Sequence, residues 1–141
     1  MQDENSLSHT KWECKYHVVW IPKYRRKKLY GEIRGYLGGE LKRLARSYGC
    51  EILEGHIMPD HIHALISIPP KISVSRAMGY IKGKSAIYIA KRFRGRTKNF
   101  TGENFWARGY YVSTVGRYEK MIREYIKNQE EEDKQLDLLN Q

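Results

Sequence analysis

Two histidines separated by a single residue, His61 and His63, form the pair in this sequence best suited to metal chemistry. The surrounding segment is apolar and predicts a β-strand, in which residues at i and i+2 project from the same face. Both imidazoles can therefore reach one ion, and neutral imidazole is a common metal ligand. A His-x-His triplet also arises by chance or as a surface pair, so the spacing alone leaves both interpretations open.

The strand that carries these histidines is predicted to lie in the centre of a sheet. Its other residues supply apolar side chains to both faces: Ile62, Leu65, Ile66 and Ile68. Burying two histidines in such a strand is costly unless a partner satisfies their polar atoms. This cost favours the metal-binding interpretation.

A tyrosine and a glutamine, Tyr125 and Gln129, stand four residues apart on the last predicted helix, where their side chains project next to each other. A tyrosine on a helix face with isoleucines is more often a core residue whose hydroxyl is bonded at the rim. Residue types do not favour Tyr125 over Tyr110, Tyr111 or Tyr118. Spacing also cannot give the distance from Tyr125 to the histidines.

The charge of the chain points to a polyanionic partner. The formal net charge is +10, and the last twelve residues hold five of the 16 acidic residues but only one of the 26 basic residues. Residues 1–129 therefore carry 25 basic and 11 acidic residues, or +14. A charge of this size favours nucleic acid, with an anionic membrane surface as the rival.

A membrane location is the weaker of these two interpretations. The longest apolar run has five residues, Ala86 to Ala90, and the N-terminal segment is polar. We therefore expect a soluble, cytoplasmic protein that does not enter a membrane. The two cysteines, Cys14 and Cys50, form neither a disulfide framework nor a zinc spacing, so both are expected to be reduced and structural.

Hydrophobic periodicity predicts four strands and three helices in the order β-α-β-β-α-β-α. Strands are expected at 14–21, 50–55, 61–68 and 110–115, and helices at 32–49, after a cap at Ser73, and at about 118–132. This order predicts an α+β, ferredoxin-like or RRM-like fold: a four-stranded antiparallel sheet, two backing helices and a C-terminal helix. Residues 1–141 are expected to form one domain, with residues 130–141 as an acidic tail.

Five segments, taken together, carry a specific resemblance: 16–26 (YHVVWIPKYRR), 59–70 (PDHIHALISIPP), 79–85 (GYIKGKS), 105–116 (FWARGYYVSTVG) and 125–129 (YIKNQ). In order and spacing they resemble the single-tyrosine HUH transposases (TnpA type) of small bacterial insertion sequences. That family includes relatives associated with repetitive extragenic palindromes. The resemblance covers nearly the whole chain.

The resemblance implies a site and a reaction. Tyr125 would be the nucleophile, and His61, His63 and Gln129 would bind a divalent metal, Mg²⁺ or Mn²⁺. The family cleaves and rejoins hairpin-bearing single-stranded DNA through a 5′-phosphotyrosine intermediate, works as a homodimer and uses no small-molecule cofactor. A basic surface would hold the DNA through Lys23, Arg25, Arg26, Lys27, Lys82, Lys84 and Arg92.

Less specific interpretations of the same residues stay open. Basic runs are usually a solvated face, and His17 on the first strand is either a core or rim residue or a contact to DNA. A non-catalytic RRM-like RNA-binding module would fit the charge, but the aromatic signature of that class is absent. A domesticated relative that nicks palindromes would keep every catalytic residue.

Overall fold

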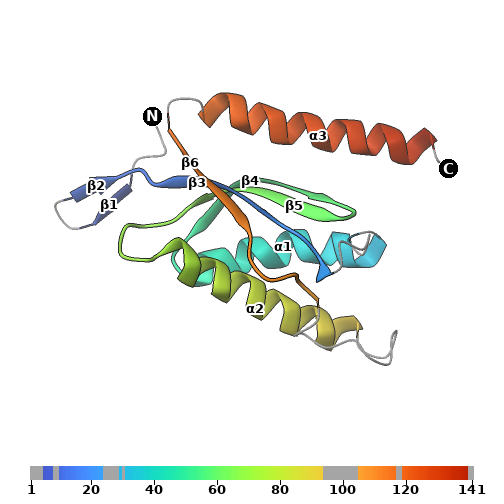
Figure 1. The fold of residues 1–141 in the computed structure, drawn as a ribbon, viewed down its shortest axis with the longest axis horizontal. Coiled ribbons are helices and arrows are strands. Elements are labelled where there is room, and N and C mark those ends of the chain that lie inside the picture. The colour runs from blue at the N-terminus through green and yellow to red at the C-terminus, as the bar shows by residue number, and fades with distance from the viewer. Residues whose placement is uncertain are drawn as a thin grey trace.

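The structure centres on a four-stranded antiparallel sheet whose strands lie in the order β4-β5-β3-β6 (Figure 1). This computed structural model describes residues 5–7, 10–23, 29, 31–93, 105–116 and 119–139. The strands are β3 (Lys15–Trp20), β4 (Glu51–Met58), β5 (His61–Ser67) and β6 (Tyr111–Val115). β5 pairs with a strand on each side, as its apolar residues predict.

Two helices cover one face of the sheet and a third helix covers the other. α1 (Gly31–Ser47) and α2 (Val74–Phe93) lie side by side below the sheet in Figure 1, and α3 (Glu119–Leu139) lies above it. The chain therefore has the predicted α+β, ferredoxin-like fold with a C-terminal helix added. Ser73 caps α2 as expected, because its Oγ accepts a hydrogen bond from the backbone N–H of Arg76 at 3.1 Å.

The period of two along β5 divides its side chains between two apolar clusters. The main core lies between the sheet and the helix pair, with Val18, Trp20, Ile62, Ile66, Leu37, Ile81 and Ile89 among its buried members. A smaller cluster of Leu65, Val115 and Ile126 holds α3 against the opposite face. Because Leu65 belongs to this second cluster, His61 and His63 also face α3.

A glycine pair in α1 and a tryptophan in the main core each carry an energetic cost. Gly38 and Gly39 lie inside α1, where each glycine is about 1 kcal/mol less favourable than alanine. A Cβ atom added at Gly38 would lie 3.9 Å from Cδ1 of Ile57, and one at Gly39 would point into open space, so packing requires neither glycine. Trp20 is buried, and its Nε1 has no hydrogen-bond partner in the described part of the chain, which costs about 1–3 kcal/mol.

The structure differs from the sequence-based expectation at several element ends. A short hairpin, β1 (Asn5–Leu7) and β2 (Thr10–Trp12), forms in the polar N-terminal segment. β4 runs on to Met58, and α3 continues to Leu139 through the residues predicted as a tail. Glutamate, lysine, glutamine and leucine are good helix formers, which explains the longer helix. No helix in the described residues combines the length and apolar character needed to cross a membrane.

The docking of α3 is expected to depend on one isoleucine. Ile126 is fully buried against Leu65 and Val115, so Ile126→Ala should weaken the attachment of α3 by about 2–4 kcal/mol. Amide hydrogen exchange in α3 measures this effect. Met121→Ala is the matched control, because Met121 is 65% exposed on the same helix. Equal exchange in the two variants would contradict the assigned packing.

Candidate metal and nucleophile site

The two predicted ligands lie next to each other on β5. The ring centroids of His61 and His63 are 4.6 Å apart, and both rings face α3. His63 is buried, with 9% of its surface exposed, whereas His61 is partly exposed. The strand spacing therefore brings both imidazoles to one place, as the sequence predicts.

A hydrogen bond orients each ring. Nδ1 of His61 lies 2.7 Å from Oδ1 of Asp60, and since a carboxylate only accepts, the imidazole donates. Nδ1 of His63 lies 3.2 Å from Nε2 of His17, whose ring stacks on it with centroids 5.4 Å apart. In both rings the second nitrogen, Nε2, is the one left to bind a metal, an arrangement typical of metal-binding histidines.

The surroundings of His63 keep its ring neutral. Burial, followed by the nearby rings of His61, His17 and His56, lowers the pKa of His63 to about 4. Burial also lowers the pKa of His17. A neutral imidazole keeps the lone pair that a metal ion requires, so His63 is ready to act as a ligand at neutral pH.

The tyrosine and the glutamine from α3 lie over this pair. The ring centroid of Tyr125 is 6.3 Å from that of His63, and 54% of the tyrosine side chain is exposed. Nε2 of Gln129 donates a hydrogen bond to Oη of Tyr125 at 2.6 Å. The structure thus brings all four predicted residues together within one chain.

The remaining atom of the glutamine amide suits a metal. Oε1 of Gln129 is buried and has no hydrogen-bond partner among the described residues. Within those residues, no group of three or more His, Cys, Asp and Glu side chains is arranged to hold an ion. The amide oxygen of Gln129 would be a third protein ligand beside the two imidazoles. The unsatisfied Oε1 fits that role.

Two further histidines belong to this surface. His17 contacts His63 from β3, and the buried His56 lies opposite His63 on β4. Nδ1 of His56 is 4.0 Å from Oε2 of Glu130, the residue after Gln129. A two-residue turn at 59–60 pairs residue 58 with residue 61, and therefore residue 56 with residue 63. The hairpin spacing could thus have predicted that His56 lies beside His63. No comparable sequence signal places His17, because its contact depends on the register between β3 and β5.

The residues predicted to contact DNA have different surroundings. Lys84 and Arg92 lie exposed on α2, with Lys84 above the ring of Tyr80 and Arg92 above that of Tyr36. Lys23 is partly exposed just after β3. Arg25, Arg26 and Lys27 lie outside the described residues.

Lys82 makes structural contacts. Its Nζ donates hydrogen bonds to the carbonyl oxygens of Ala107 and Gly109, each at 2.8 Å. Burial lowers its pKa. The ammonium group therefore ties α2 to the segment that leads into β6.

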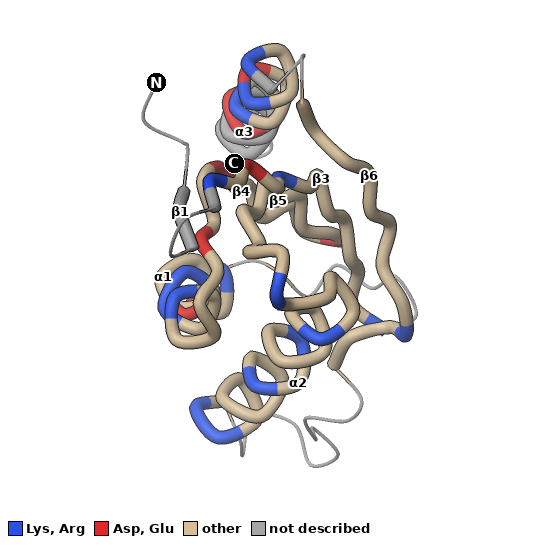
Figure 2. Tube along the Cα trace, turned by 90° about the vertical axis from the view of Figure 1, so that its left-hand side faces the viewer, with Lys and Arg blue, Asp and Glu red and all other residues tan. Residues whose placement is uncertain are grey.

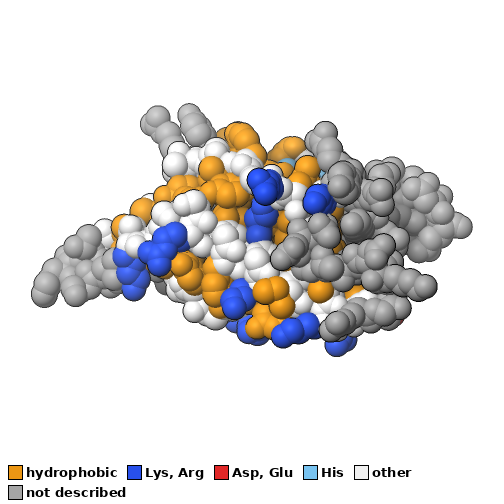
Figure 3. Space-filling model, turned by 60° about the horizontal axis from the view of Figure 1, so that its bottom comes forward, with side chains coloured by type: hydrophobic (Ala, Val, Ile, Leu, Met, Phe, Trp, Pro, Cys, Tyr) orange, Lys and Arg blue, Asp and Glu red, His pale blue; other side chains and the backbone are white. Residues whose placement is uncertain are grey.

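The basic helix lies on the opposite side of the sheet from the histidines. α2 contains Lys and Arg but neither Asp nor Glu, and Figure 2 shows its basic residues below the sheet while α3 lies above. Figure 3 brings the α2 side forward and shows Lys and Arg side chains spread among hydrophobic ones. The sheet therefore separates this basic surface from the tyrosine and histidine group.

The family model and the relatives that this sequence matches are all described as transposases. Residues 10–129 match the family model "Transposase IS200 like". The transposase for insertion sequence element IS200 from Salmonella typhimurium is 50% identical over 134 residues, which cover 95% of this chain and 88% of that protein. The ISDra2 transposase TnpA from Deinococcus radiodurans is 29% identical over 123 residues, 86% of this chain and 88% of that protein.

Solved structures share the fold. A crystal structure of a candidate transposase from Deinococcus radiodurans R1 superposes with a TM-score of 0.70 at 28% identity, covering 89% of this chain and 96% of that one. A REP-associated tyrosine transposase bound to a REP hairpin superposes with a TM-score of 0.58 at 18% identity, covering 80% of this chain and 62% of that one.

The low pKa of His63 has a consequence for stability. In the unfolded chain a histidine titrates near 6.5, so protonation favours the unfolded state as the pH falls from 6.5 to about 4. His63 should therefore add stability above pH 6.5 that is lost as the pH falls to about 4, by about 3 kcal/mol at most.

Urea unfolding of the wild type and His63→Gln, both in the presence of a chelator, tests this expectation. The free energy of unfolding of the variant should fall less steeply between pH 6.5 and 4. Parallel curves for the two proteins would contradict it.

Proposed function

Because this chain belongs to the IS200-like transposase family, we propose that it cuts and rejoins single-stranded DNA with Tyr125 as the nucleophile. The observation that carries this proposal is the position of the tyrosine. Tyr125 is exposed, its hydroxyl is held by Gln129, and its ring makes an edge contact with the imidazole ring of His63. A structural tyrosine would more often bury its ring and bond its hydroxyl at the rim.

The reaction begins when Oη of Tyr125 attacks the phosphorus of the scissile phosphodiester in line. An O–P bond to the tyrosine forms as the bond from phosphorus to the 3′-oxygen breaks. The phenol loses its proton and the leaving oxygen gains one, which gives a 5′-phosphotyrosine and a 3′-hydroxyl. Attack by a 3′-hydroxyl on the phosphotyrosine reverses these steps and rejoins a strand.

Gln129 assists through both ends of its amide. The hydrogen bond from Nε2 to Oη of Tyr125 holds the attacking oxygen in position. Oε1, together with Nε2 of His61 and of His63, would hold Mg²⁺ or Mn²⁺. Such an ion, when bound, supplies Lewis-acid polarisation of the scissile phosphate.

DNA binding is proposed for the basic surface. The +10 charge of the chain and the absence of acidic residues from α2 support contacts to phosphates by Lys84 and Arg92. We propose hairpins in single-stranded DNA as the form recognised on this surface. Each chain offers one nucleophile of this type, so joining two DNA ends calls for two copies, and we propose a homodimer.

The nucleophile assignment is tested with Tyr125→Phe. Wild-type protein incubated with Mn²⁺ and single-stranded oligonucleotides that copy the DNA flanking the gene should form a covalent adduct, visible on a denaturing gel. Tyr125→Phe should form none, because it lacks the attacking oxygen. Tyr111→Phe is the matched control, since Tyr111 is 61% exposed, and should retain the adduct. An adduct of unchanged yield in Tyr125→Phe would overturn the assignment.

The metal assignment is tested by replacing the amide ligand. Gln129→Ala should weaken Mn²⁺ binding by about tenfold or more, because one of three protein ligands is lost. The electron paramagnetic resonance signal of free Mn²⁺ measures this affinity without any cleavage. Asn128→Ala removes the neighbouring exposed amide and should leave the affinity unchanged. Equal Mn²⁺ affinity in both variants would remove Gln129 from the ligand set.

A further inference from the structure

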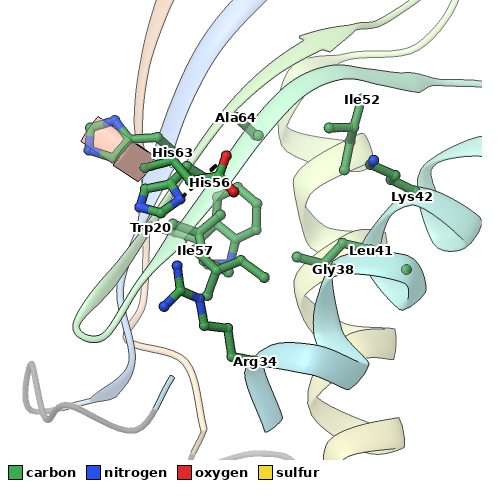
Figure 4. A pocket seen from close by; sticks show the side chains of 14 residues that line it. Trp20, Arg34, Gly38, Leu41, Lys42, Ile52, His56, Ile57, His63 and Ala64 are labelled. Carbon is green, nitrogen blue, oxygen red and sulfur yellow. Dashed lines mark ion pairs between the residues drawn. The ribbon is translucent and has the colours of Figure 1, made fainter. Parts of the chain in front are cut away.

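The ring of His63 lies between two other histidines on the same face of the sheet. His56 pairs with it from β4, and Figure 4 shows these two side chains beside each other. His17 lies on its other side, on β3, where it pairs with Leu65, a residue of the cluster beneath α3. Residues paired across antiparallel strands share a face, so all three imidazoles face the helix that carries Tyr125.

The contact between His17 and His63 has the geometry of a nitrogen-to-nitrogen hydrogen bond. Nε2 of His17 lies 3.2 Å from Nδ1 of His63, the ring centroids are 5.4 Å apart, and the ring planes are inclined by 15°. The two distances differ by close to two imidazole ring radii, so both nitrogens lie near the line that joins the ring centres. The ring of Tyr111 packs edge-on against His17 from β6, with centroids 6.4 Å apart. His17 is therefore held in place to direct one nitrogen at His63.

The proton of this hydrogen bond can belong to either ring. Between two neutral imidazoles, one nitrogen donates and the other accepts. If Nδ1 of His63 donates, Nε2 of His63 keeps its lone pair, but if His17 donates, Nε2 of His63 carries the proton and cannot bind a metal. His61 has no such choice, because its Nδ1 faces the carboxylate of Asp60 at 2.7 Å. The position of one proton thus decides whether His63 can be a ligand.

We propose that His17 is a positioning residue that accepts the Nδ1 proton of His63 and so keeps Nε2 of His63 free for the metal. The inference rests on the proposed function and adds to it the acceptor behind one ligand. His17 then carries its own proton on Nδ1. Partners of this kind fix the tautomer and the orientation of a metal-binding histidine. The register of β3 on β5 supplies the acceptor, because His17 is the diagonal neighbour of His63.

The proton positions can be measured directly in metal-free protein at neutral pH. The NMR chemical shifts of the imidazole nitrogens distinguish a protonated nitrogen from one with a free lone pair. In the wild type, Nδ1 of His63 should be protonated, and Nε2 of both His63 and His17 should be unprotonated. A wild-type protein with the proton on Nε2 of His63 would overturn the proposal.

Two substitutions at position 17 separate the hydrogen bond from the packing. His17→Phe keeps a flat ring against Tyr111 but has no acceptor. We expect the proton of His63 to move to Nε2, its preferred site in an isolated neutral imidazole, and Mn²⁺ binding to weaken by about ten- to a hundredfold. His17→Gln supplies an amide oxygen as the acceptor and should bind Mn²⁺ within about threefold of the wild type. Electron paramagnetic resonance of free Mn²⁺ measures both affinities.

A purely structural role for His17 predicts different results. Retention of the Nδ1 proton of His63 in His17→Phe, or an equal Mn²⁺ affinity in His17→Phe and His17→Gln, would overturn the proposal. Should His17→Phe fail to fold, the wild-type proton positions and a loss of about tenfold or more in His17→Gln would still decide against it. The spectra need neither DNA nor metal. Failure of the wild type to form a covalent adduct, with the proton on Nδ1 of His63, would therefore contradict the proposed function alone.

Discussion

The antiparallel pairing of β5 between β3 and β4 is the constraint on which the rest of the site depends. This pairing places His17 and His56 on the two sides of His63 and surrounds its ring with other imidazoles. The same pairing sends Ile62 and Ile66 to the opposite face, where they join the main core. The stability of the core therefore fixes the position of the histidines, because a shift of one residue would exchange the two faces.

The second constraint is the direction in which α3 crosses the sheet. Among the described residues, a small apolar cluster of Leu65, Val115 and Ile126 packs this helix against the sheet, and that contact helps to decide where Tyr125 and Gln129 lie. The contact between His56 and Glu130 lies one residue beyond Gln129 and adds a polar attachment at the same end of the site. A helix held by few contacts can still place its side chains accurately when those contacts flank the residues that matter.

The sequence predicts the elements and the shared face of the two histidines well because both depend on local periodicity. Alternation along β5 is enough to place His61 and His63 on one face, and helical spacing is enough to pair Tyr125 with Gln129. The distance between these two groups depends on how α3 docks, and no local pattern contains that information. Lys82 shows the same limit, because no local pattern in the sequence predicts its hydrogen bonds to the carbonyl oxygens of Ala107 and Gly109.

The position of the sheet between α2 and the histidine group has an evolutionary consequence. Substitutions at sites that are far apart and share no partners usually act independently. Under the proposed assignment, exposed residues on α2 can change and alter DNA binding while the groups around His63 stay as they are. A fold with this partition would let DNA binding diverge without changes to the proposed catalytic group, and a single sheet provides the separation.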